Sequence, residues 1–66
     1  MDNEALTEIR AYYPAAEVVR VMFRGERIGF GVALEPGDEY IGYAPTKLTA
    51  ANKARRLLVA GGSLPD

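Results

Sequence analysis

The stretch from residue 18 to residue 44, VVRVMFRGERIGFGVALEPGDEYIGYA, decides the fold of this 66-residue chain. Apolar residues recur in it at a period of two, in runs over 18–24, 28–34 and from 39 or 40 to 44. A period of two is typical of strands that bury one face. Because short turns separate the runs, the stretch predicts a three-stranded antiparallel meander.

The turns and the alternation assign each strand residue to a face. Gly25-Glu26 is interpreted as a two-residue turn, and 35–38 (EPGD) as a second turn. We expect the face covered by helices to carry Val19, Val21, Phe23, Ile28, Phe30, Val32, Leu34, Ile41 and Tyr43. We expect the opposite, outward face to carry Val18, Arg20, Met22, Arg24, Gly29, Gly31, Ala33, Tyr40 and Gly42.

Helical signals flank the meander on both sides. Asp2 is a suitable N-cap for a helix over 3–12, which Pro14 would end. A second helix is expected from Thr46 or Thr49 to the stop signal Gly61-Gly62, with Leu48, Ala51, Ala54 or Arg55, and Leu58 in one stripe. The sequence therefore predicts an α+β fold: a two-layer αβββα domain over 1–62, with both helices on one sheet face and a tail over 63–66.

Composition restricts the chemistry. The chain has no Cys and no His, so it lacks thiolate nucleophiles, Cys-based zinc sites and the commonest general base. We expect no enzyme activity, no cofactor and no metal. Eight Lys and Arg against nine Asp and Glu give a net charge of −1, which excludes a generally basic nucleic-acid coat. Without an apolar run for a signal or a membrane span, a cytoplasmic protein is expected.

The order helix, meander, helix resembles the double-stranded-RNA-binding domain. Residues 25–31 (GERIGFG) are similar to that family's glycine-spaced hairpin, and 47–56 (KLTAANKARR) to the Lys- and Ala-rich start of its second helix. The resemblance implies an αβββα fold and phosphate contacts at the start of the second helix. Lys47 is the single lysine at that point of this chain.

Two groups of side chains are candidates for binding a partner protein. One contains the acidic residues around the second turn and the tyrosine after them: Glu35, Asp38, Glu39 and Tyr40. The other lies on the expected outward face: Arg20, Met22 and Arg24. Tyr12 and Tyr40 are expected to be exposed, and Tyr13 and Tyr43 to be in the core.

The chain is therefore expected to be a small non-catalytic binding protein. Its size and composition resemble small phage-encoded inhibitors of the anti-CRISPR type. That resemblance implies steric occupation of a partner surface, such as the arginine-rich nucleic-acid channel of a host complex.

Two alternatives remain open. The first is a nucleic-acid-binding domain that uses the sheet face and the second helix, through Arg20, Arg24, Arg27, Lys47 and Lys53. The second is a homodimeric accessory protein, paired through the third strand or the flat sheet face.

Overall fold

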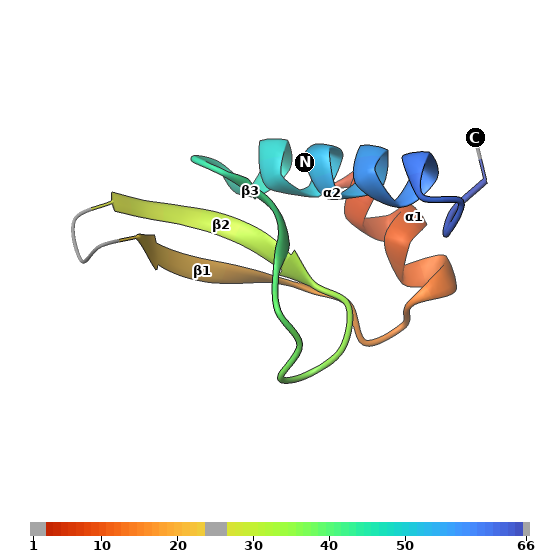
Figure 1. Cartoon of the computed structure of the whole chain (residues 1–66), viewed down its shortest axis with the longest axis horizontal. Coiled ribbons are helices and arrows are strands. Elements are labelled where there is room, and N and C mark those ends of the chain that lie inside the picture. Colours follow the sequence, from red (N-terminus) through yellow and green to blue (C-terminus); the bar gives the residue numbers. More distant parts are fainter. Residues whose placement is uncertain (1–2, 24–26, 66) are drawn as a thin grey trace.

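A computed structural model describes residues 3–23 and 27–65 of the chain, without the side chains of Phe23 and Arg27. The elements follow the order α1 (Glu4–Tyr12), β1 (Glu17–Phe23), β2 (Arg27–Ala33), β3 (Ile41–Ala44) and α2 (Lys47–Ala60) (Figure 1). The strands form one antiparallel sheet in the order β1-β2-β3. The predicted α+β, αβββα fold is confirmed.

Side-chain caps fix where the helices begin. The N-cap of α1 is Asn3, not the expected Asp2, and its Oδ1 accepts a hydrogen bond from the Leu6 amide at 3.2 Å. The N-cap of α2 is Thr46, whose Oγ1 accepts from the Thr49 amide at 3.2 Å. Each cap satisfies an amide that the first helical turn leaves without a backbone partner. Neither helix in the described ranges is long and apolar enough to cross a membrane.

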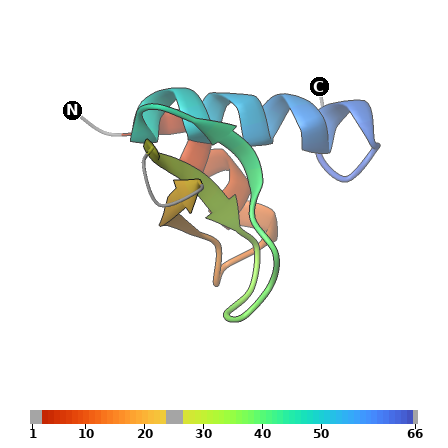
Figure 2. The ribbon, with the colours of Figure 1, turned by 60° about the vertical axis from the view of Figure 1, so that its left-hand side comes forward.

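Both helices pack against one face of the sheet (Figure 2). Ile9 of α1 and Val32 of β2 are the largest fully buried side chains that the structure describes. Most of the other buried apolar residues in the described ranges are alanines: Ala5, Ala16, Ala33, Ala44, Ala50, Ala51 and Ala54. Small side chains let α2 lie close to the sheet.

The pairing of β1 with β2 overturns the predicted faces of β1. Arg20 lies opposite Phe30 and Met22 opposite Ile28, and directly opposed residues share a face. Val18, opposite Val32, packs against the core, so Val18, Arg20 and Met22 lie on the helix side of the sheet.

The same pairing places Val19 and Val21 on the opposite, outer face, where they face Gly31 and Gly29. The predicted inner positions of Val32, Leu34 and Ile41 are confirmed by their packing in the core.

One residue of register causes this reversal. A two-residue turn at 25–26 would have paired residue 24 with residue 27, whereas the last pair is Phe23 with Arg27, so three residues separate the strands. A shift of one residue moves every side chain of a strand to the other face. The predicted position of Arg24 falls outside the described residues.

The hairpin of β1 and β2 extends beyond both helices (Figure 1). Met22 and Ile28 lie near its far end and are 65% and 51% exposed. Ile28 therefore lies on the predicted side of the sheet, but no helix covers it.

Candidate binding surfaces

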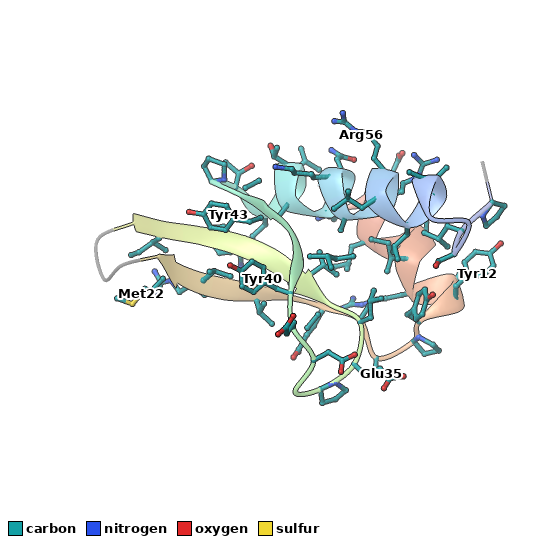
Figure 3. The ribbon with its side chains drawn as sticks, viewed as in Figure 1. Tyr12, Met22, Glu35, Tyr40, Tyr43 and Arg56 are labelled. Carbon is teal, nitrogen blue, oxygen red and sulfur yellow. The ribbon has the colours of Figure 1, made fainter. Side chains whose placement is uncertain are left out.

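Two tyrosine rings, not open space, cover the glycines of β2 on the outer face. A Cβ atom added to Gly31 would lie 2.5 Å from Cδ1 of Tyr40, and one added to Gly29 would lie 2.4 Å from Cε2 of Tyr43. Figure 3 shows both rings across the front of the hairpin. Their centroids are 6.3 Å apart and their planes are tilted by 54°, a favourable aromatic arrangement. The flat sheet face expected from the sequence is therefore wrong.

A bulge in β3 places Tyr43 on this face. Phe30 pairs with Ala44 and Val32 with Ile41, so Gly42 and Tyr43 together oppose the single residue Gly31. The extra residue reverses the alternation, which is why Tyr43 lies on the outer face and not in the helix-covered core as predicted.

Gly42 begins the bulge with a φ of +71° and faces α2, not the outside as predicted. A Cβ atom there would lie 2.6 Å from the Ala54 nitrogen and 2.7 Å from the Ala50 carbonyl oxygen.

The acidic residues lie next to this tyrosine pair in the chain. Glu35, Asp38 and Glu39, called here the acidic rim, are all exposed, and the Asp38 amide donates to the Glu35 carbonyl at 3.1 Å. None of the three forms an ion pair with a residue that the structure describes. Tyr40 follows them and is 41% exposed. The sequence thus identified four residues that share one region of the surface.

The second predicted group does not join the first. Arg20 and Met22 lie on the helix side of the sheet, opposite to Tyr40, and Arg24 is outside the described residues. The prediction that Arg20 and Met22 lie on the outward face together with Tyr40 is therefore wrong.

Arg20 lies instead beside a basic and apolar groove. One cavity of about 310 Å³ lies between β1, β2 and the start of α2, and a second of about 610 Å³ lies between α1, β1 and the start of α2. The two cavities share Val18 and Lys47. We call the combined feature the basic groove and define it by Leu6, Val18, Arg20, Phe30, Lys47 and Leu48.

Sequence reasoning missed the apolar part of this groove. Leu48 was expected in the buried stripe of the second helix, but it is 55% exposed. Phe30 lies on the predicted side of the sheet, and the Lys47 ammonium lies 5.7 Å from the centre of its ring. The position of Leu48 in the first turn of α2 is the signal that could have identified it, because a first turn often extends past the sheet that the helix covers.

The residues predicted to contact nucleic acid in the alternative function do not lie together on one surface. Arg20 and Lys47 line the same cavity, whereas the Lys53 ammonium donates to the Tyr43 carbonyl at 3.3 Å. Arg24 and the Arg27 side chain are outside the description. Of the other cations on α2, Arg55 is bound to the carboxylate of Glu8.

Tyr12 is 55% exposed and Tyr13 packs against the core, as predicted. Among the described residues, no three metal-ligating side chains gather at one point. Comparison of the chain with protein-family models, with curated proteins and with solved structures gives no match in any of the three.

Proposed function

We propose that this chain is a small non-catalytic protein-binding module that docks through Tyr40 and the acidic rim onto a basic partner surface. One observation carries the proposal: Tyr40 is partly exposed, rests on Gly31, and follows three carboxylates that have no partner among the described residues.

The geometry of Tyr40 suits an interface anchor. Tyrosine is enriched among the residues that dominate binding energy. Contact with Gly31 and with the ring of Tyr43 restricts the rotamers of Tyr40 before a partner arrives. A side chain that is already fixed loses less entropy on binding. Half-buried Val19 and Val21 extend the apolar area on the same face.

The acidic rim indicates the chemistry of the partner. Exposed carboxylates attract a surface rich in Arg and Lys and raise the rate of association with it. Protein channels that hold nucleic acid have such surfaces, because their cations neutralise phosphates. We therefore propose that the chain occupies a channel of this kind sterically, in the manner of small phage-encoded inhibitors of the anti-CRISPR type.

The test compares charge reversals at matched exposed carboxylates. Wild-type protein, Asp38→Lys, Glu39→Lys and Glu4→Lys are immobilised, and proteins captured from a host lysate are quantified by mass spectrometry. Glu4 is exposed on α1 and lies outside the acidic rim, so its reversal is the control. We expect a partner that Glu4→Lys captures as well as the wild type does. The amount of this partner captured by each rim variant should be lower by a factor of about ten or more. A partner retained equally by all four proteins would contradict the proposal.

A second candidate function, nucleic-acid binding, is supported by the shared cavity of Arg20 and Lys47. Fluorescence anisotropy with labelled duplex DNA and RNA at low salt tests it. Micromolar binding that weakens steeply with salt, and that is lost in Lys47→Glu, would favour this function over protein docking.

A further inference from the structure

The basic groove lies on the helix side of the sheet, and none of the described side chains fills it. We propose that this groove binds an acidic, amphipathic peptide segment of a second protein. The proposal goes beyond the docking function above, since it concerns other residues on the other side of the sheet, and either proposal can fail alone.

The lining of the groove requires an occupant with an apolar side. Leu6, Val18 and Phe30 line it, and Leu48 projects 55% exposed at its border. Met22 continues this surface along the hairpin, beyond the helices. A surface of adjoining, half-exposed large apolar side chains is typical of an interaction site.

The dimensions suit a short helical segment. From Val18 to Met22 the strand rises about 13 Å, at about 3.3 Å per residue. A helix covers that distance in about nine residues, or two to three turns. A segment of this length can present apolar residues at positions i, i+3, i+4 and i+7 to such a groove.

The charges of the groove require carboxylates on the same segment. Arg20 and Lys47 line it, and no acidic residue in the first turn of α2 offsets Lys47. Arg10 also borders it, with its Nε donating to the Ala16 carbonyl at 2.8 Å, while Glu17 is the single carboxylate in the described lining. The net charge of these side chains is positive, so an acidic segment is complementary to the groove.

The apolar lining favours a peptide over nucleic acid. Base stacking needs a free aromatic face, but the Lys47 ammonium already lies over the ring of Phe30. Half-exposed Leu48 and Met22 offer no hydrogen bond to a phosphate or a base edge. A peptide helix with an apolar face flanked by carboxylates would contact the apolar residues of the groove and pair with its basic residues.

Selection from a random 16-residue peptide display library against the whole protein tests the proposal. We expect enrichment of sequences that combine Asp or Glu with Leu, Ile or Phe at helical spacing. The best of them, synthesised and labelled, should bind about tenfold more weakly to Arg20→Glu and to Lys47→Glu, a loss equivalent to about 1.4 kcal/mol. Arg56→Glu is the matched control, because Arg56 is exposed on α2 and points away from the sheet (Figure 3).

Each other outcome overturns the proposal. The proposal is wrong if no peptide is enriched, or if the enriched peptides are basic or uncharged. It is also wrong if the selected peptide binds equally to Arg20→Glu, Lys47→Glu and Arg56→Glu. A 20-nucleotide DNA strand that binds more tightly than any peptide, with dependence on Arg20 and Lys47, would assign the groove to nucleic acid. A second copy of the chain as occupant would appear as a dimer in sedimentation that Lys47→Glu dissociates.

Discussion

Gly42→Ala should be the most damaging single-methyl change among the described glycines. Two independent effects lower the free energy of unfolding at this position: backbone strain and a steric clash. The backbone φ is +71°, which L-residues other than glycine rarely adopt. The new methyl group would also lie 2.6 Å from the backbone nitrogen of Ala54, where only a movement of α2 away from β3 can make room.

A matched variant separates the two costs. Gly37 has a φ of +85°, but nothing lies within 4 Å of an added Cβ atom. Gly37→Ala should therefore cost only the left-handed backbone penalty, about 1–2 kcal/mol. Gly42→Ala should cost that amount and a further contribution of about 1–3 kcal/mol from overpacking. The effect of alanine on the unfolded chain is the same for both variants and cancels in their difference.

The measurement is urea unfolding followed by circular dichroism. A 66-residue domain has a free energy of unfolding of about 3–10 kcal/mol, so the combined cost of about 2–5 kcal/mol would remove a large fraction of it in Gly42→Ala. With a slope near 1 kcal/mol/M, we expect the midpoint to fall by about 1–2 M for Gly37→Ala and by at least about 2 M for Gly42→Ala. Equal midpoints for the two variants would refute the close contact of α2 with the bulge.

Three further predictions concern other contacts. Ile9→Ala, at a side chain with no exposed surface, should lower the free energy of unfolding by about 2–5 kcal/mol in the same assay. Gly31→Ala should destabilise more than Gly29→Ala. Its methyl group would lie 2.8 Å from Cβ of Tyr40, close to the backbone, whereas at Gly29 it would meet only the far end of the Tyr43 side chain. Equal midpoints would contradict this. A double-mutant cycle on Glu8 and Arg55 should give a coupling of less than about 1 kcal/mol that decreases in 1 M salt, since both side chains are partly exposed, and a larger coupling that survives salt would contradict it.

The order of the elements and the ends of both helices followed from local sequence signals, whereas β1 and β2 each lie one residue earlier than expected. Pro14 and the Gly61-Gly62 pair lie just beyond the helix ends, and the turn before Tyr40 lies between two strands. The N-terminal cap differed from the prediction by one residue. The residues Glu35, Asp38, Glu39 and Tyr40 were found together because they are neighbours in the chain.

The faces of the strands could not be read from β1 alone. Its residues 18–23 (VVRVMF) have apolar side chains at both alternating positions, so either face could be buried. The hairpin register then decides, and residues 23 and 27 pair where the sequence interpretation paired 24 and 27. In β3 the bulge at Gly42 lies against α2, and this contact between separate elements is not visible in the local pattern of β3. For these reasons Arg20 and Tyr43 were each assigned to the wrong side.

The core contains mainly small side chains and the surface carries several large apolar ones, and this distribution links the stability of the fold to the proposed binding role. The described core is mainly alanine, while Met22, Ile28 and Leu48 are each more than half exposed. Full burial of an exposed side chain of this size stabilises by about 1.5–3 kcal/mol, so covering the exposed half of one adds about half of that, and a domain of this size gains little from its own core. A partner that covers these residues would therefore stabilise the fold as well as gain affinity. Because a ligand that binds only the folded state raises stability by mass action, the thermal midpoint of the protein should rise with the concentration of a peptide that occupies the basic groove. A peptide that binds without raising it would indicate that the peptide binds the unfolded chain about as tightly as the folded one.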